Sequence, residues 1–399
     1  MARLIGTVSR GVRAPIIRKG DDIVDVVSDA VLSAAASENI PFLDKDVIAL
    51  TESIVARAQD NYASVDAIAQ DVKSKYPNGE VGLVFPILSR NRFAINLKGI
   101  ARAMDKIYLQ LSLPSDEVGN QLISYDAFEE SGLSIWNSAL TEEQYRAHFG
   151  QSLHPYTGVD YISYYREIAE AEDCEIEIIL SNNPRVILDY TKDVLTCDIH
   201  SRKKNLRRIE EAGANILFNI ESILTEPIGD NGYNPEFGML GANKATEESV
   251  KLFPRGSQAV VDALSKKLSE ATGKQIEVMI YGDGAFRDPT SQIWELADPI
   301  VSPAHTPGLS GVPQEIKLKY VADNTFADLT GEALDEAVKN FIQEKDKDTS
   351  EVDQESAVGT TPRKITDLLG SLADLTSGSG DKGTPIVWIQ GYFDDLADA

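Results

Sequence analysis

The sequence predicts a globular fold that mixes α-helices with short β-strands in a chain of 399 residues. Short apolar runs bounded by turn residues are typical of buried strands, and apolar residues recur at helical spacing in longer segments. With 42% hydrophobic and 25% charged residues, the composition suits a protein with a sizeable core. The clearest strand candidates are 46–53, 276–281 and 386–389, and the clearest helix candidates are 23–34 and 257–271.

The chain is strongly acidic, with 63 acidic residues, 38 basic residues and a formal net charge of -25. This balance disfavours a nonspecific nucleic-acid binder, which needs a basic surface, but it is compatible with a nucleotide bound by a few local cations. No apolar run approaches the roughly 18 residues of a membrane span, and the first residues lack an apolar signal core. Two cysteines, Cys174 and Cys197, cannot form a disulfide framework, so we expect a cytoplasmic protein with reduced thiols. From the acidic charge and the short apolar runs we expect no nucleic-acid partner and no membrane partner.

The N-terminal part is expected to alternate strands and helices. A strand within residues 2–17 leads into a basic turn, and Asp21 and Asp22 can cap the next helix, because carboxylates accept its free N–H groups and suit its dipole. The strand at 46–53 runs directly into a helix that carries Arg57. Further strands are predicted at 83–88 and 107–113, with a helix at 93–104.

The middle of the chain, residues 115–235, differs from the rest in its residue pattern and contains clustered tyrosines. We interpret it as an inserted subdomain. Three short strands are predicted in it, at 175–180, 185–191 and 193–200. Residues 343–361 are polar and acidic, which predicts a mobile loop, and a helix is expected at 362–375. The predicted divisions are 1–114, 115–235, 236–342, 343–361 and 362–399.

The most informative motif is the strand 276–281 with the turn Gly282-Asp283-Gly284 that follows it. Glycine permits backbone angles and close approaches that other residues resist. A carboxylate on such a turn can reach a divalent metal, because hard cations prefer oxygen ligands. Arg287 and Asp288 place both charge signs next to it. The alternative is an ordinary solvated turn, for which Gly-Asp-Gly is common.

A second loop, Ser377-Gly378-Ser379-Gly380-Asp381-Lys382-Gly383-Thr384, offers closely spaced backbone N–H donors and one lysine. Such a loop can wrap phosphate oxygens. It lacks the serine-to-helix context of a Walker sequence. A flexible surface loop is the alternative interpretation.

Two further segments carry groups suited to anions. Thr51-Glu52-Ser53 with Arg57 combines hydroxyls with a cation, a set that can hold a phosphate or a ribose. Arg10 and Arg13 lie on one turn and can bind a nucleotide or a carboxylate. An ordinary helix cap and plain surface charge are the respective alternatives.

Other chemistries find little support in the sequence. Cys197 and His200 form one pair, whereas zinc needs four ligands, or three and a water. No Gly-x-Ser-x-Gly elbow is present and no Gly-x-Gly-x-x-Gly follows a first strand, which disfavours serine hydrolases and ordinary dinucleotide enzymes.

Taken together, these segments resemble the coenzyme F420-0 gamma-glutamyl ligase family. Residues 10–15 before Gly20-Asp21-Asp22 are similar to the family's N-terminal nucleotide loop, and 46–53 with Arg57 to its second strand. Gly241-Ala242-Asn243 falls where the family has a metal-binding aspartate. Residues 281–284 resemble its second metal-binding turn, and 377–384 with the strand at 385–389 resemble its C-terminal nucleotide loop. The resemblance covers both ends well and the middle poorly.

The resemblance implies an α+β fold, with mixed or antiparallel sheets and packed helices in an intertwined arrangement, and a homodimer. It implies a ligase in which GTP and Mg²⁺ or Mn²⁺ convert a substrate carboxylate into an acyl phosphate. The amino group of L-glutamate then attacks the acyl phosphate to form an amide. Residues 1–114 and 236–342 would be the N-terminal and metal-binding parts of this ligase-like domain, and 362–399 would complete its nucleotide site.

The resemblance also assigns site residues. Asp283 is expected to be catalytic and to bind metal with Gly284, Asn243 and Asp288. The expected nucleotide-binding residues are Arg10, Gly11, Val12, Arg13, Glu52, Ser53, Arg57, Ser377, Gly378, Ser379, Gly380, Asp381, Lys382, Gly383 and Thr384.

Two departures from the family pattern leave part of the function open. Asn243 keeps a carbonyl ligand but removes a negative charge, and Arg57 replaces a lysine and prefers a planar partner. The inserted middle and the loop at 343–361 are also not part of the minimal family pattern, and they leave the acceptor open: an F420 precursor, folate or another carboxylate. ATP is an alternative to GTP. The competing interpretations are a catalytically silent nucleotide-binding or regulatory protein, and a metal-dependent phosphohydrolase that consumes nucleotide without an amine acceptor.

Overall fold

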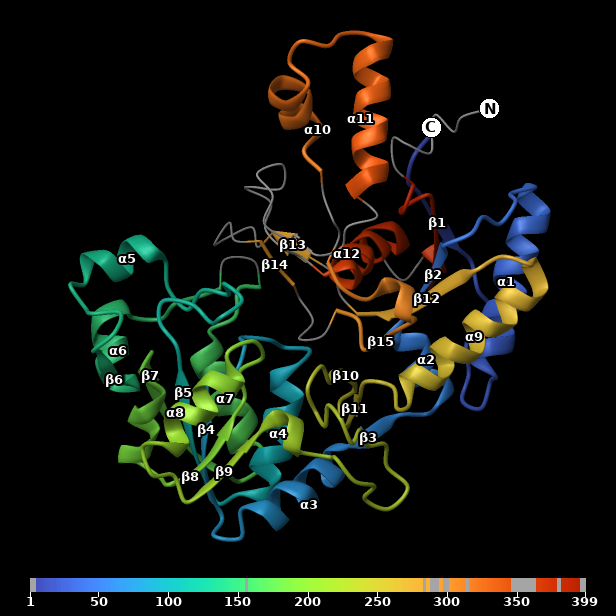
Figure 1. Cartoon of the computed structure of the whole chain (residues 1–399). Coiled ribbons are helices and arrows are strands. Elements are labelled where there is room, and N and C mark those ends of the chain that lie inside the picture. Colours follow the sequence, from blue (N-terminus) through green and yellow to red (C-terminus); the bar gives the residue numbers. More distant parts are fainter. Residues whose placement is uncertain are drawn as a thin grey trace.

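Strands from both ends of the chain share one sheet. The structure is a computed structural model that describes residues 5–154, 157–282, 285–287, 294–296, 301–312, 316–345, 364–378 and 382–394. Figure 1 shows two lobes, with a small sheet between them. The strands of the first lobe are β1 (Val8–Val12), β2 (Asp46–Thr51), β12 (Ile276–Tyr281), β15 (Ala304–His305) and β16 (Ile386–Gln390). Their order is β1-β16-β2-β12-β15, in which only β2 and β12 are parallel neighbours.

Side chains of this sheet alternate between two buried faces, as the two-residue period of a strand requires. Ile48 and Leu50 pack under the two helices of one face, whereas Val47 and Ala49 pack under a single helix on the other. The first pair of helices is α1 (Ile23–Glu38) and α9 (Ser257–Thr272), and the single helix is α12 (Ile365–Ser377).

Buried Asp46 fixes β2 against β16. Its Oδ2 atom accepts hydrogen bonds from Nε1 of Trp388 (2.9 Å) and Nε2 of Gln390 (2.8 Å). Because a buried carboxylate is costly unless it is hydrogen-bonded, these contacts favour one register of the two strands.

The second lobe contains a largely parallel sheet of six strands. They are β4 (Glu80–Val84), β5 (Lys106–Leu111), β6 (Ala139–Thr141), β7 (Glu175–Ser181), β8 (Asp193–Thr196) and β9 (Ile216–Asn219). Their order is β6-β7-β5-β4-β8-β9, and only β6 is antiparallel to its neighbour. The first strand, β4, lies inside the sheet and later strands add on both sides, which is the winding of a doubly wound α/β sheet.

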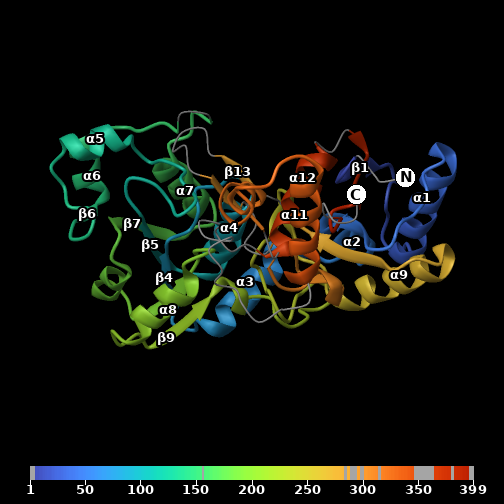
Figure 2. The ribbon, with the colours of Figure 1, turned by 45° about the horizontal axis from the view of Figure 1, so that its top comes forward.

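Helices cover both faces of the six-stranded sheet. One face packs against α3 (Val65–Lys75), α4 (Phe93–Ala103) and α7 (Tyr161–Glu170). The other packs against η1 (Pro184–Asp189) and α8 (Arg202–Glu210). Two short helices, α5 (Tyr125–Glu130) and α6 (Glu142–Phe149), lie at the outer end of this lobe (Figures 1 and 2).

The pairing of β5 with β7 crosses the predicted division between residues 114 and 115. Lys106 pairs with Glu175, and Leu111 pairs with Leu180. The second lobe therefore includes α3, β4, α4 and β5 together with most of the middle region.

A three-stranded sheet lies between the lobes in Figure 1. It has the order β10-β11-β3 and consists of β10 (Asn243–Thr246), β11 (Ser249–Lys251) and β3 (Tyr62–Ser64). Helix α2 (Glu52–Ala58) leads from β2 to β3.

Residues 316–345 form a helical excursion with a small core of its own, made by Val321, Val338 and Ile342. The N–H of Ile365 donates to the carbonyl of Gly311 (3.0 Å), which closes the base of this excursion. Its elements are α10 (Leu318–Tyr320), the π-helix η4 (Val321–Thr325) and α11 (Glu332–Lys345). The remaining short elements are η2 (Ile220–Ser222), β13 (Ala285–Arg287), β14 (Trp294–Leu296) and η3 (Pro307–Leu309).

The α+β class is confirmed, because mixed and antiparallel sheets pack with helices in one chain. The strand predicted at 185–191 is wrong, since η1 is a 3₁₀ helix there. Asn183 accepts a hydrogen bond from the N–H of Arg185 (3.2 Å), and Pro184 suits the first helical position. Helix α11 extends to Lys345, into the predicted loop, and 346–361 lie outside the described residues. No helix in the described part of the chain is long and apolar enough to span a membrane.

Candidate functional site

The candidate site lies at one edge of the five-stranded sheet. β2 and β12 end there side by side, with Thr51 opposite Tyr281. β16 begins at the same edge, because Ile386 pairs with Leu50, and β1 ends there, because Val12 pairs with Ile386. The sheet therefore brings together segments that are separated by more than 300 residues in the sequence.

A cavity of about 530 Å³ opens at this edge, a volume typical of small-molecule sites. We call it the edge cavity. Among the predicted nucleotide-binding residues, Ser53, Arg57, Ser377, Gly378, Gly383 and Thr384 line it. Its other lining residues are Ala14, Pro15, Ile16, Ile17, Thr51, Ile54, Tyr281, Gly282, Asp374 and Pro385.

Hydrogen bonds tie the glycine-rich loop to the rest of the edge cavity. The N–H of Ala14 donates to the carbonyl of Gly383 (3.2 Å). The hydroxyl of Thr384 donates to the carbonyl of Ser377 (2.7 Å), which joins the two ends of the loop. Residues 379–381 lie outside the described residues, so the roles of Ser379, Gly380 and Asp381 stay predictions.

Two glycines are needed for close approaches at this loop. A Cβ atom at Gly11 would lie 2.9 Å from Cβ of Thr384, so a side chain there would push β1 away from the loop. Gly378 has a φ of +65°, a conformation that favours glycine. A Cβ atom there would lie 2.7 Å from Nζ of Lys382, which places the lysine ammonium against the loop backbone.

A second cavity, of about 610 Å³, adjoins the first and shares Ser53 and Arg57 with it. We call it the basic cavity, because five cationic side chains line it and Asp60 is the one carboxylate among the described lining residues. In a chain of net charge -25, such a concentration of positive charge indicates a site for anions. The five cations are Arg18, Lys19, Arg57, Lys244 and Lys251.

Some of these cations are neutralised within the protein. Lys19 pairs with Asp60 (Nζ–Oδ2, 2.6 Å), and this hydrogen bond raises the pKa of Lys19 above its ordinary value. Lys244 pairs with Glu247 of its own hairpin (2.5 Å). Within the described part of the chain, Arg57 has no ion-pair partner, and its charge is therefore available to a ligand.

Glu52, predicted to contact the nucleotide, forms an ion pair with a lysine, and its contact with a nucleotide stays a prediction. Its side chain is 8% exposed and forms an ion pair with Lys251, whose side chain is 13% exposed. This pair links α2 to β11 and fixes Lys251 in the wall of the basic cavity.

Arg10 and Arg13 line a third cavity, of about 930 Å³, that lies between β1 and α1. The guanidinium of Arg10 lies 5.8 Å from the ring centre of Trp388 and donates to Oε1 of Gln390 (2.7 Å). Gly11 and Val12 also line this cavity, so the residues 10–13 face it and not the edge cavity. The backbone that follows, from Ala14 onward, reaches the edge cavity.

Of the predicted metal ligands, Asn243 is described, and it lines the basic cavity with Ser53 and Arg57. Asp283, Gly284 and Asp288 lie outside the described residues; Asp283 directly follows Gly282, which lines the edge cavity. No cluster of three or more His, Cys, Asp or Glu suited to a metal occurs among the residues that the structure describes. The amide carbonyl of Asn243 is a hard donor, but Asp60, the one carboxylate among the described lining residues of this cavity, is already paired with Lys19. This setting therefore fits a metal that arrives with anionic oxygens.

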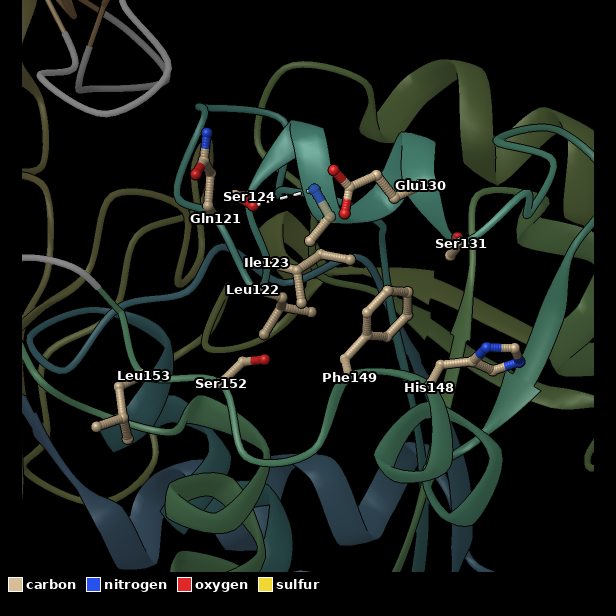
Figure 3. Close-up of a pocket in the computed structure, with 11 residues that line it drawn as sticks. Gln121, Leu122, Ile123, Ser124, Glu130, Ser131, His148, Phe149, Ser152 and Leu153 are labelled. Atoms are coloured by element: carbon tan, nitrogen blue, oxygen red, sulfur yellow. Dashed lines mark hydrogen bonds between the residues drawn. The ribbon is translucent and has the colours of Figure 1, made fainter.

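Figure 3 shows a further cavity, of about 640 Å³, between the 121–124 loop, α5 and the end of α6. Leu122, Ile123 and Phe149 form its apolar floor, and Glu130 and His148 lie at its rim. None of the predicted site residues lines it, so it is separate from the candidate site.

The sequence interpretation missed most of the basic cavity. Lys244 and Lys251 lie on the two strands of one short hairpin, seven positions apart, in a stretch that also carries Glu247 and Glu248. A local charge count does not distinguish these lysines from ordinary surface residues. Only the pairing of β11 with β3 carries them to the wall opposite Arg57.

Comparison with known proteins gives one family and no curated relative. No curated protein matches the chain at a significant level. A family model described as F420-0:Gamma-glutamyl ligase matches residues 11–391, which include both lobes and both adjoining cavities. The match therefore extends through the middle region, where the motifs were weakest. This chain belongs to the F420-0:gamma-glutamyl ligase family, whose activity is that of a ligase adding glutamate.

Proposed function

We propose that this ligase is nucleotide- and metal-dependent, and that it activates a substrate carboxylate as an acyl phosphate before joining it to L-glutamate. The observation that carries the proposal is the pair of adjoining cavities with Ser53 and Arg57 in their common wall. A glycine-rich loop borders one cavity and suits phosphates. Five cations line the other and suit an anionic acceptor.

In this proposal the edge cavity holds the nucleotide, with GTP as the first candidate. The backbone at Gly378 and Gly383 borders the phosphates, and Lys382 supplies a cation next to them. The hydroxyl of Ser53 can donate to a phosphate or ribose oxygen. Arg57 lies between the two reactants, where its planar guanidinium can bind two oxygens at once.

The proposed reaction has two steps. An oxygen of the acceptor carboxylate attacks the γ-phosphorus while the bond to the β,γ-bridging oxygen breaks, which gives an acyl phosphate and a nucleoside diphosphate. The amino group of L-glutamate then attacks the acyl carbon, phosphate leaves, and the nitrogen loses a proton as the amide forms. The cations around the basic cavity hold anions together that would otherwise repel one another, and they stabilise the charge that develops.

Asp283, Gly284, Asp288 and Asn243 are the residues proposed to hold Mg²⁺ or Mn²⁺. A bound divalent ion would neutralise charge on the phosphates during transfer. Asn243 lies within the same cavity as Arg57, so a metal–phosphate complex would meet both residues.

The test combines binding with turnover. Calorimetry on the purified protein with Mg²⁺ or Mn²⁺ should show binding of GTP or ATP. With L-glutamate and F420-0, folate or other carboxylates, nucleoside diphosphate and inorganic phosphate should form together with an amide. The Asp283→Asn variant should lose metal-dependent turnover while its thermal unfolding stays unchanged. A well-folded, metal-replete protein that binds no nucleotide would refute the proposal, and full turnover by the variant would remove Asp283 from the site.

The same assays separate the alternatives. Nucleotide binding without any turnover indicates a silent regulatory protein, the case that Asn243 favours because it lacks the charge of a metal carboxylate. Nucleotide consumption without an amine acceptor indicates a phosphohydrolase. The homodimer and the cytoplasmic location stay predictions, and light scattering would measure the former.

A further inference from the structure

The β10–β11 hairpin supplies one wall of the basic cavity. Asn243 and Lys244 on β10 and Lys251 on β11 face the cavity that Arg57 borders from the first lobe. The separation between the two groups of cations therefore depends on where this hairpin is held. Figure 1 places the hairpin between the lobes, so its position is set by contacts with both.

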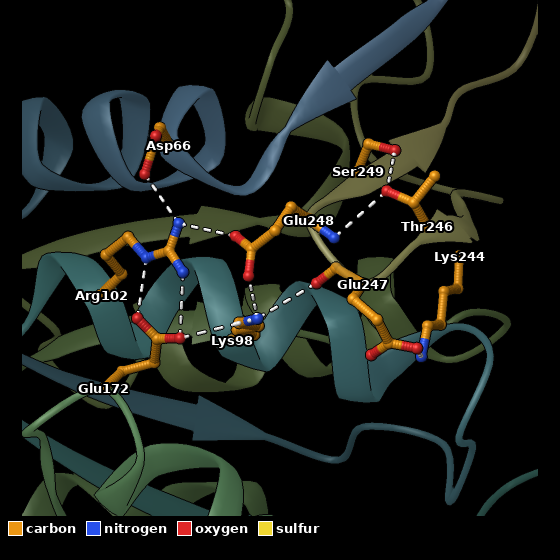
Figure 4. A network of polar contacts seen from close by, with 9 residues as sticks. All are labelled: Asp66, Lys98, Arg102, Glu172, Lys244, Thr246, Glu247, Glu248 and Ser249. Carbon is orange, nitrogen blue, oxygen red and sulfur yellow. Dashed lines mark hydrogen bonds and ion pairs between the residues drawn. The ribbon is translucent and has the colours of Figure 1, made fainter.

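The turn of the hairpin is clamped to helix α4 of the second lobe, as Figure 4 shows. The carboxylate of Glu248 lies between two cations of α4 and forms ion pairs with both, with 3.0 Å between its Oε2 atom and Nη1 of Arg102. Nζ of Lys98 also donates to the backbone carbonyl of Glu247 (3.1 Å). Lys98 and Arg102 are four residues apart and lie on the same face of α4. Together they bind the side chain of Glu248 and the backbone of the hairpin turn.

Glu172 fixes this clamp from the opposite side. Its carboxylate accepts two hydrogen bonds from Arg102, from Nε (2.7 Å) and from Nη2 (3.0 Å), in the paired geometry that a guanidinium favours. The hydrogen bond with Glu172 is the main reason that the pKa of Arg102 is raised, and Lys98 followed by Arg102 lowers the pKa of Glu248. The clamp is therefore fully charged at neutral pH.

Two backbone contacts continue the attachment along the hairpin. The N–H of Lys244 donates to the carbonyl of Asn91 (2.6 Å), in the segment that leads into α4. The N–H of Val65 donates to the carbonyl of Glu248 (3.0 Å), at the start of α3. The hairpin is thus docked on the second lobe at its turn and at its first strand, while Lys251 reaches across to Glu52 of the first lobe.

We propose that Glu248 is a positioning residue for anion binding: its clamp on Lys98 and Arg102 sets the place of Lys244, Lys251 and Asn243 opposite Arg57. The inference rests on the proposed function in taking the basic cavity as the site of an anionic reactant. Glu248 itself does not line that cavity. It acts through the backbone of the hairpin, by joining the second lobe to the anion site.

The first test measures whether the clamp holds the hairpin, independently of any activity. Glu248→Gln keeps the shape of the side chain and removes its charge. Hydrogen exchange of the amides in 243–251 should become faster in this variant, whereas exchange in the six-stranded sheet should not change. Asp66→Asn is the matched control, because Asp66 also pairs with Arg102 (2.7 Å) but its exposed carboxylate does not touch the hairpin. Equal exchange in the two variants would overturn the proposal.

The second test measures anion binding with pyrophosphate as the probe, by calorimetry at low salt. Glu248→Gln should weaken pyrophosphate binding severalfold, because the hairpin cations are then no longer held in place relative to Arg57. Asp66→Asn should bind as the unmodified chain does. Faster hairpin exchange with unchanged pyrophosphate affinity would refute the positioning role.

Failure of this inference is distinguishable from failure of the proposed ligase reaction. If the reaction is established, Glu248→Gln should raise KM for the carboxylate acceptor and leave KM for GTP unchanged. A double variant, Lys98→Glu with Glu248→Lys, exchanges the two charges and restores an ion pair. If the position of the hairpin determines anion binding, this variant should recover part of the affinity for pyrophosphate. If hydrogen exchange of the hairpin becomes slow again but the affinity for pyrophosphate does not recover, the position of the hairpin does not determine anion binding.

Discussion

The carboxyl group of Asp198 gives the sharpest test of the electrostatics of the second lobe. Asp198 follows β8 and is fully buried. Its Oδ2 atom accepts hydrogen bonds from the hydroxyl of Ser201 (2.8 Å) and from Nδ2 of Asn205 (2.9 Å). Burial, and next the negative charge of nearby Glu117, raise the pKa of Asp198 from the ordinary 3.8 to about 7.

The sign of the effect follows from the raised pKa. The folded protein favours the protonated carboxyl. The contribution of Asp198 to the free energy of unfolding is therefore fully present below pH 4 and is lost as pH rises toward about 7. A pKa difference of about three corresponds to a loss of about 4 kcal/mol once the group is ionised. Asp198→Asn cannot ionise, and its amide oxygen can still accept from Ser201 and Asn205. We expect the variant to be more stable than the unmodified chain by about 4 kcal/mol at pH 8, by about 2 kcal/mol at pH 5, and by almost nothing below pH 4.

Urea denaturation at pH 5, 6, 7 and 8 measures this difference directly. Asp116, whose pKa burial raises to about 6, contributes equally to both proteins and cancels in the comparison. Glu117→Gln is the matched control, because it removes the neighbouring charge and should reduce the pH dependence of the unmodified Asp198. A stability difference between Asp198→Asn and the unmodified chain that is the same at pH 5 and pH 8 would refute the reasoning.

Two further predictions concern the candidate site. Arg57→Ala should weaken GTP binding at least about tenfold in calorimetry, because the variant loses a charge-assisted contact with the nucleotide. Its thermal unfolding should not change, because the side chain of Arg57 is exposed. An unchanged affinity for GTP would place the nucleotide elsewhere. Lys251→Ala should cost about 3 kcal/mol of folding stability, because it breaks the ion pair between Lys251 and the buried carboxylate of Glu52. Adding Glu52→Gln should recover most of that loss in urea denaturation, and equal destabilisation of the single and double variants would contradict this account.

The sheet that carries the edge cavity could be predicted strand by strand from local pattern. The runs at 46–51, 276–281 and 386–390 are mostly apolar, because both faces of the sheet are covered, and Asp46, Glu277 and Gln390 are their buried polar exceptions. The end of α9 could also be predicted, because glycine is common directly after a helix. Gly273 adopts the left-handed conformation of such a position, with a φ of +67°. The segments expected to bind a nucleotide emerge from this predictable part of the fold, which is why Ser53, Arg57 and the loop ends could be grouped in advance.

The six-stranded sheet could not be assembled in the same way. Its strands are visible as short apolar runs, but strand order depends on the packing of α3, α4 and α7, which local pattern does not encode. The error at 185–191 has a local cause: Val186 to Leu188 are β-prone, yet Asn183 and Pro184 start a 3₁₀ turn. The family match across 11–391 rests on the whole chain, and no single motif of the middle region would have given it.

The arrangement of the five-stranded sheet has a consequence for biosynthesis. Strand β16 lies between β1 and β2 in the sheet but is the last of the five strands to be synthesised. Among the residues that the structure describes, it is also the one strand that pairs with β1. A growing chain that has not yet released residue 390 therefore exposes one side of the apolar strand β2 and lacks part of the lining of the edge cavity.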